Sequence, residues 1–501
     1  MLRQISHYTV IQQTDRQIRL LFRECKNFTW LLVLELRAVG KTTFRRLWRQ
    51  LVPYVVRTRP LTDLCWECQR NNEALYRSAN LPDSMKSAKL QQQQQHLSLV
   101  QEERSIYNTM VHDAKLTVAA AGIKTLGCHE PRSHDFDMHY SFDFAQQVHY
   151  PSSPLQPGPM YFLVPRKCGI FGVCCEALPQ QVNYLVDEGM CTSKGSNAVI
   201  SYLHHFFSNW GLGEAAVHLH CDNCSGQNKN KFMLWYLCWR TISHLHHSVT
   251  LNFMISGHTK FAPDWCFGLL KQRYRRTPVS TLADIATVVN SSTVVGVNCA
   301  EIVGTENGKV SVPTYDWQAN FEAYFKPFQG IKSVQHFRFS ADAPGIMFYK
   351  VTPSSEEKSF QLLRDTSNLP DDISPTELAP PGLLLERQWY LYHKIREFVR
   401  QDAQDITCPK PAVPVSTSAS AVVTEHSAQS TSVVRPPSTG KRSLPQEKAV
   451  QTKMPKQKEL GNAATANQNT TVTVASVDQS PSPRKSSRSR SANRQLSDFC
   501  L

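Results

Sequence analysis

The chain has 501 residues, 41% of them hydrophobic, which is enough material for one large or two to three ordinary globular domains. Its 55 lysines and arginines outnumber its 41 aspartates and glutamates, and the formal net charge of +14 favours a polyanionic partner such as nucleic acid. Glu35 and Arg37 interrupt the most apolar run, residues 28–40, which excludes a membrane helix there, so no membrane partner is expected.

Residues 1–60 are expected to form a basic helical region. Within residues 41–55, apolar side chains recur at helical spacing, and the other faces carry Arg45, Arg46 and Arg49. With Gly40 in a preceding turn, this helix would be the second of a helix-turn-helix whose arginines point toward DNA. A basic amphipathic helix packed on its own domain is the alternative.

Residues 61–130 combine a cysteine pair with a long polar, helix-favouring stretch. The sequence CWEC at residues 65–68 allows Cys65 and Cys68 to bind one Zn²⁺, although a structural zinc site needs four ligands. Free thiols are the alternative. The stretch after Pro82 predicts a helical hairpin or arm. Candidates for the missing zinc ligands are His96, Cys25, His112, Cys128 and His129.

Residues 135–280 alternate strand-like and helix-like patterns, and they predict an α/β fold with a mixed sheet flanked by helices. Three consecutive strands are followed by alternating helices and strands. The expected strands are 138–150, 160–178, 181–189, 215–222 and 249–255, and the expected helices are 196–214, 228–242 and 263–275.

Three acidic residues mark this core. Asp143 lies in the first expected strand, Asp222 ends the fourth, and Asp264 begins the last helix. If the first and fourth strands are neighbours, the three carboxylates meet at one end of the sheet, where their repulsion calls for Mg²⁺ or Mn²⁺. The alternatives are a helix cap for Asp222 and a first-turn acid favoured by the helix dipole for Asp264. Asp143 would be costly to bury unpaired.

The order of elements, with these acids, resembles the ribonuclease H-like fold of the DDE/DDD transposases and integrases. Four segments, at residues 140–148, 181–189, 221–230 and 257–275, also resemble a transposon-derived, uncharacterised family with a D-N-C-x-G-Q-N-K-N motif. The resemblance implies phosphodiester hydrolysis or strand transfer by a metal-bound Asp triad, with His258 assisting catalysis. Many transposases end the triad with Glu, whereas this chain offers Asp264, which reaches less far.

Two polar segments near these acids are candidates for nucleic-acid contacts. The block SGQNKN at residues 225–230 predicts a loop in which Gln227, Asn228, Lys229 and the following Lys231 hold phosphate; a glycine turn with a polar helix start is the alternative. The last helix carries Lys271, Arg273 and Arg275, which suit phosphate contact beside the active site or complement the helix dipole.

After residue 280 the patterns weaken. Residues 281–400 predict an appended module and a final helix near residues 384–399, and residues 405–501 predict a disordered basic tail whose Arg/Lys-rich runs suit nuclear import. The expected function is transposase-like or integrase-like chemistry on DNA in the nucleus, and a homo-oligomer is compatible with it. The alternatives are a domesticated, catalytically inactive nuclear DNA-binding protein and a zinc-organised interaction scaffold.

Overall fold

The computed structural model describes residues 46, 64–78, 80–365 and 374–413. The chain divides into two units, Met1–Thr424 and Glu425–Leu501, and all the described residues belong to the first. Arg45, Arg49 and most of the expected tail lie outside the described residues, and Arg46 is exposed on a helix.

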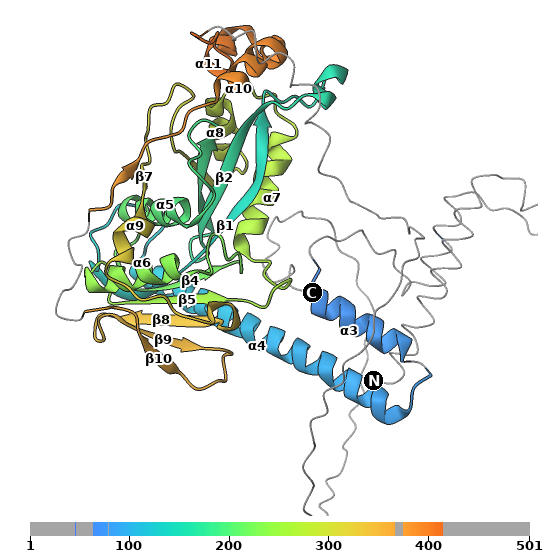
Figure 1. Cartoon of the computed structure of the whole chain (residues 1–501), viewed down its shortest axis with the longest axis vertical. Coiled ribbons are helices and arrows are strands. Elements are labelled where there is room, and N and C mark those ends of the chain that lie inside the picture. Colours follow the sequence, from blue (N-terminus) through green and yellow to red (C-terminus); the bar gives the residue numbers. More distant parts are fainter. Residues whose placement is uncertain (1–45, 47–63, 79, 366–373, 414–501) are drawn as a thin grey trace, which may run out of the picture. The chain divides into compact units, whose positions relative to one another are not determined.

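A nine-stranded mixed sheet forms the centre of the described unit, in the order β10-β9-β8-β5-β4-β1-β2-β3-β6 (Figure 1). The first three strands pair antiparallel, whereas β1 pairs parallel with β4 and β4 pairs parallel with β5. The five strands that were expected are all present. They are β1 (His134–Tyr150), β2 (Arg166–Cys175), β3 (Gln180–Asp187), β4 (Glu214–Cys221) and β5 (Ser248–Phe253).

Helices cover both faces of this sheet, because its strands alternate apolar side chains on each face. One face packs Tyr140 and Phe142 against α5 and α6, and the opposite face packs Ala145 and Ile170 against α7 and α8. Figure 1 shows α5 and α7 on opposite sides of β1 and β2. The helices are α5 (Ser196–Asn209), α6 (Lys231–Ile242), α7 (Ala262–Tyr274) and α8 (Leu282–Asn290).

The strands after residue 280 extend the same sheet. β6 adds in parallel to β3 at one edge, and β8 adds antiparallel to β5 at the other, followed by β9 and β10. The region expected as an appended module therefore shares its backbone hydrogen bonding with the core. These strands are β6 (Asn298–Ile302), β8 (His336–Ser340), β9 (Ile346–Lys350) and β10 (Lys358–Gln361), and β7 (Thr314–Tyr315) pairs with β11 (Glu377–Leu378) beside α9 (Trp317–Glu322).

A helical hairpin precedes the sheet, as the sequence predicts. It consists of α3 (Trp66–Arg77) and the 39-residue α4 (Asp83–Ala121), which ends at Gly122 with a φ of 68°. The side chains that α4 buries recur at spacings of three, four or seven residues, so one stripe of the helix meets the core. No helix in the part of the chain that the structure describes has both the length and the apolar composition to cross a membrane.

The last described segment differs from the single helix expected at residues 384–399. Short helical turns follow one another there, and Leu391 and Ile395 form a small core of their own with Cys408. The chain is still helical at residue 405, where the tail was expected to begin. The turns are α10 (Leu385–Tyr390), a π turn (Leu391–Ile395), two 3-10 turns (Arg396–Phe398 and Gln401–Ala403) and α11 (Gln404–Thr407).

Candidate functional site

Asp143 and Asp222 are brought together by the parallel pairing of β1 and β4. Phe142 lies opposite Cys221 in this register, so the next residue of β1 is Asp143 and the residue that follows β4 is Asp222. Phe142 and Cys221 are fully buried in the core under α5 and α6. Because side chains alternate along a strand, the Asp143 carboxylate projects from the opposite face, which α7 covers.

Asp264 lies in the first turn of α7, and its side chain is exposed. Its Oδ2 accepts a hydrogen bond of 3.2 Å from the backbone amide of Phe261, which fixes the carboxylate against the helix start. α7 can approach β1 closely because Gly172, the β2 partner of Asp143, has no side chain. A Cβ atom at Gly172 would lie 2.8 Å from Cε1 of Phe267.

The electrostatics couple Asp143 to the two other acids. Burial, followed by the charges of Asp222 and Asp264, raises the pKa of Asp143 to about 7, while the charge of Lys271 acts in the opposite direction. Burial lowers the pKa of Lys271, and both Asp264 and Asp143 act against that change. Asp143, Asp222, Asp264 and Lys271 therefore form the candidate acidic site.

The sequence after Asp222 holds that carboxylate in place. Its Oδ1 accepts hydrogen bonds from the side-chain amide of Asn228 at 2.6 Å and from the backbone amide of Cys224 at 3.2 Å. Asn230 caps α6, since its side chain accepts from the amides of Phe232 and Met233. The block SGQNKN is thus a turn with a polar helix start, the alternative stated above.

Two residues expected to bind phosphate are buried instead. Asn228 is 2% exposed and Lys229 is 4% exposed, so neither can contact nucleic acid in this conformation. The Lys229 ammonium donates to Oδ1 of Asn223 at 2.8 Å and to Oε1 of Gln335 at 3.0 Å, and burial lowers its pKa to about 8. Both residues have structural roles.

The other expected phosphate contacts remain accessible to different degrees. Arg273 and Arg275 are exposed at the end of α7, whereas Lys271 is half-buried. Gln227 is also half-buried, and Lys231 lies over the rings of Phe232 and Trp235. The cations at the end of α7 are therefore the most available to a polyanion.

A second group of potential ligands joins the helical hairpin to the core. Among the residues that the structure describes, Cys65, Cys68, His96 and His258 are the one set whose ligand atoms all lie within 4.8 Å of one another. The three carboxylates do not form such a set. His258 comes from the loop between β5 and α7, and it lies here although the resemblance implied a catalytic role for it.

The spacing within this Cys/His cluster suits a tetrahedral ion. His96 Nε2 lies 3.5 Å from Cys65 Sγ and 3.4 Å from His258 Nε2, which in turn lies 3.3 Å from Cys68 Sγ. Zinc bonds of about 2.3 Å to sulfur and about 2.05 Å to nitrogen, at tetrahedral angles, give edges of roughly 3.5 Å for S···N and roughly 3.3 Å for N···N. The cluster could therefore hold a metal ion without rearrangement.

The surroundings of the cluster favour the same use. The Nδ1 atom of His96 lies 3.2 Å from Oε2 of Glu67, so a carboxylate orients the imidazole from behind. Burial, followed by the charge of His96, lowers the pKa of His258, which favours the neutral ring that binds metals. Burial raises the pKa of Cys68, with Cys65 contributing, so a cation would be needed to hold the thiolate.

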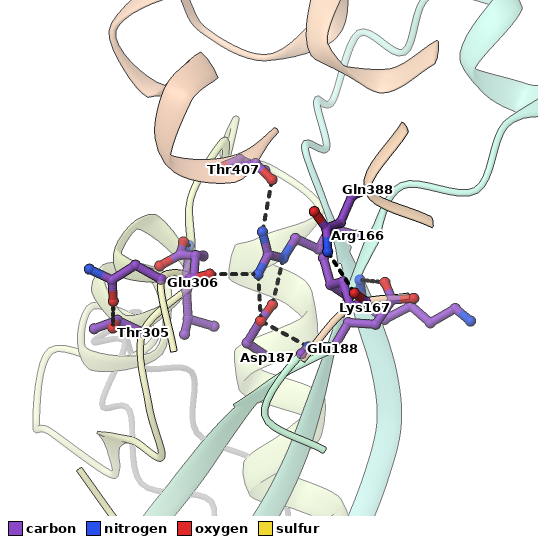
Figure 2. Close-up of polar contacts among 12 residues, drawn as sticks. Arg166, Lys167, Asp187, Glu188, Thr305, Glu306, Gln388 and Thr407 are labelled. Atoms are coloured by element: carbon purple, nitrogen blue, oxygen red, sulfur yellow. Dashed lines mark hydrogen bonds and ion pairs between the residues drawn. The ribbon is translucent and has the colours of Figure 1, made fainter. Parts of the chain in front are cut away.

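A third polar group, at the far end of β2 and β3, is structural. Figure 2 shows the Arg166 guanidinium donating to both carboxylate oxygens of Asp187, at 2.7 and 2.6 Å, and to the carbonyl oxygens of Glu306 and Thr407. A cavity of about 320 Å³ lies beside this pair. Because Arg166 already has a partner for each of these donors, it anchors the C-terminal turns to the sheet and is poorly suited to bind a ligand.

These features define the class of protein: an α/β protein with a large mixed sheet flanked by helices and a Cys/His cluster that could hold a metal ion. Residues 166–355 match a family model described as a domain of unknown function, DUF7869. No curated protein and no solved structure matches the chain significantly.

Proposed function

We propose that the described unit is a ribonuclease H-like domain that carries out hydrolysis or strand transfer of nucleic-acid phosphodiesters, with DNA as the substrate. The strand order β3-β2-β1-β4-β5, with three antiparallel strands first and a helix after each later strand, supports the fold assignment. The observation that supports the function is the register that pairs the residue before Asp143 with the residue before Asp222, with α7, which carries Asp264, packed on β1.

The residues present fit a divalent cation. The raised pKa of Asp143 reflects burial and repulsion by two further carboxylates, a cost that Mg²⁺ or Mn²⁺ would remove. Both hydrogen bonds to Asp222 use Oδ1, which directs the carboxylate and leaves Oδ2 for a cation. When bound, such ions stabilise charge on the attacking and leaving oxygens of a phosphoryl transfer.

The other side chains of the site would bind and orient the substrate. Lys271 stands beside the acids, where its positive charge would attract the scissile phosphate. Arg273 and Arg275 continue the basic surface along α7 and would contact the flanking backbone. The basic runs at residues 439–448 and 482–491 suit a nuclear protein.

We further propose that the Cys/His cluster binds Zn²⁺ as a structural site. Two cysteines and two histidines are a common zinc ligand set, and the four ligand atoms already have tetrahedral spacing. The pure protein should contain one Zn²⁺ per chain by elemental analysis. Cys68→Ser should lose that zinc, and a zinc-free wild-type chain would contradict this assignment.

A second candidate is a nuclear DNA-binding protein of the same fold without catalysis. The observation that favours it is that, among the described residues, the three carboxylates do not form a set of ligand atoms that all lie within 4.8 Å of one another. A third candidate is a zinc-organised interaction scaffold without nucleic-acid function, which would contain stoichiometric zinc and show no salt-sensitive affinity for DNA.

A nicking assay on supercoiled DNA decides among these functions. The wild-type chain with Mn²⁺ should convert the plasmid to its open form, and the triple variant of Asp143, Asp222 and Asp264 to Asn should not. Asp135→Asn, which changes an exposed acid on β1, is the matched control. Equal background from the wild type and the triple variant would remove the enzymatic proposal, and salt-sensitive DNA binding alone would favour the second candidate.

A further inference from the structure

The Cys/His cluster is connected to the acidic site through one short loop. His258 is six residues before Asp264, in the segment that joins β5 to α7. Cys65 and Cys68 come from the start of α3, and His96 comes from α4. A metal ion at the cluster would therefore tie the helical hairpin directly to the loop that leads to Asp264.

Further contacts hold the same loop against the hairpin. Arg104 of α4 donates two hydrogen bonds of 2.8 Å, to the carbonyl oxygens of His258 and Lys260. Gly257 has a φ of 80° and packs so closely that a Cβ atom there would lie 2.4 Å from the Cα of Cys65. The loop thus follows a path that the hairpin determines.

The loop ends in a buried contact at the start of α7. Phe261 packs with Tyr107 and Val111 of α4 and with Met254, the residue that follows β5. Its backbone amide is also the group that donates to Asp264. Any displacement of the loop would move both the hydrophobic contact and the carboxylate.

The helix that receives the loop is itself fixed to the sheet. Glu103 of α4 lies 3.1 Å from Nε2 of His336 on β8, and the Tyr107 hydroxyl donates to Glu176. Glu103 is 3% exposed and Glu176 is 5% exposed, so both contacts are shielded from water. α4 therefore offers a rigid support against which the loop is held.

We propose that the metal-loaded Cys/His cluster is a latch that positions Asp264, so that zinc binding at Cys65, Cys68, His96 and His258 raises the affinity of the acidic site for a divalent cation. The inference rests on the proposed function, because it concerns how Asp264 of the acidic site is positioned. His258 and Arg104 are positioning residues in this scheme. Without the metal, the four ligands have no common bonding partner, and the loop loses one of its attachments to the hairpin.

The test compares Mn²⁺ affinity in folded, full-length variants, with specific binding defined as the part that Asp222→Asn loses. His258→Ala should lose zinc and bind Mn²⁺ about tenfold more weakly, within the usual range of coupling between two sites. His258→Cys keeps a zinc ligand and should recover zinc content and Mn²⁺ affinity together. His112→Ala, an exposed histidine on α4, is the matched control and should match the wild type.

Two further measurements keep the latch testable if His258→Ala does not fold. Arg104→Met leaves all four zinc ligands in place, and it should retain zinc while binding Mn²⁺ more weakly. Amide hydrogen exchange in residues 255–264 should be faster in Arg104→Met and in zinc-deficient chains. A zinc-deficient folded variant with wild-type Mn²⁺ affinity would overturn the latch and leave the acidic site intact. Absence of specific Mn²⁺ binding by the zinc-loaded wild type would overturn the proposed function and the latch with it.

Discussion

Replacing Asp143 by Asn should stabilise the metal-free protein, and by an amount that depends on pH. The folded chain raises the pKa of Asp143 from 3.8 to about 7, first through burial and then through Asp222 and Asp264. Between these two values the folded chain keeps a proton that the unfolded chain has released. The stability of the wild type therefore falls as pH rises through this interval, and the loss is complete above pH 7.

The size of the effect follows from the interval. Each pH unit corresponds to about 1.4 kcal/mol, so the ionised carboxylate costs the folded chain up to roughly 4 kcal/mol above pH 7. Two of the three units lie between pH 5 and pH 7. The free energy of unfolding of Asp143→Asn, relative to that of the wild type, should thus increase by about 2 to 3 kcal/mol from pH 5 to pH 8.

Urea denaturation at both pH values measures this difference. The Asn side chain cannot ionise, but its oxygen can still accept the hydrogen bond that the amide of Phe144 donates at 2.7 Å. Asp135→Asn should show no comparable change, since Asp135 is exposed. A stability difference between Asp143→Asn and the wild type that stays constant from pH 5 to pH 8 would refute the argument that Asp143 is buried among like charges.

Three further changes test other parts of the account. Gly172→Ala should displace α7 from β1, which would lower the stability of the protein by about 1 to 3 kcal/mol and weaken Mn²⁺ binding. Gly226→Ala is the control, because no atom lies within 4 Å of its added Cβ, and it should change neither property. Thermal unfolding and Mn²⁺ titration measure the two effects. Arg275→Gln should reduce the slope of log DNA affinity against log salt concentration by about one, the loss of one phosphate contact. Lys229→Met should leave this slope unchanged in the same binding assay, because Lys229 is buried. Cys65→Ser should abolish zinc binding and melt at a lower temperature than the wild type. Added zinc should not raise the melting temperature of this variant.

The order of strands and helices between residues 134 and 274 could be predicted because each element carries a clear periodicity. The alternation in β1 also assigns Asp143 to the face opposite Phe142. The pairing of β1 with β4 sets Asp222 beside Asp143, and the spacing of the two residues in the sequence could only suggest this pairing. In contrast, nothing in the pattern of residues 281–400 indicated that β6 and β8 would join the same sheet at opposite edges.

The ligand set of the Cys/His cluster was only half predictable. The C-x-x-C spacing identified Cys65 and Cys68, and His96 was one of five candidates for the remaining positions. His258 was missed as a ligand because 162 residues separate it from His96, and only tertiary packing brings them together. Asn228 and Lys229 were misjudged for a related reason: a run of polar residues favours an exposed loop, but here each finds buried partners.

Anomalous diffraction from crystals of the zinc-loaded protein soaked in Mn²⁺ would locate both metal ions. We expect a manganese peak about 2.2 Å from carboxylate oxygens of at least two of Asp143, Asp222 and Asp264, with zinc at the Cys/His cluster. This expectation would be contradicted if manganese bound only elsewhere and the three carboxylates remained apart at high Mn²⁺ concentration.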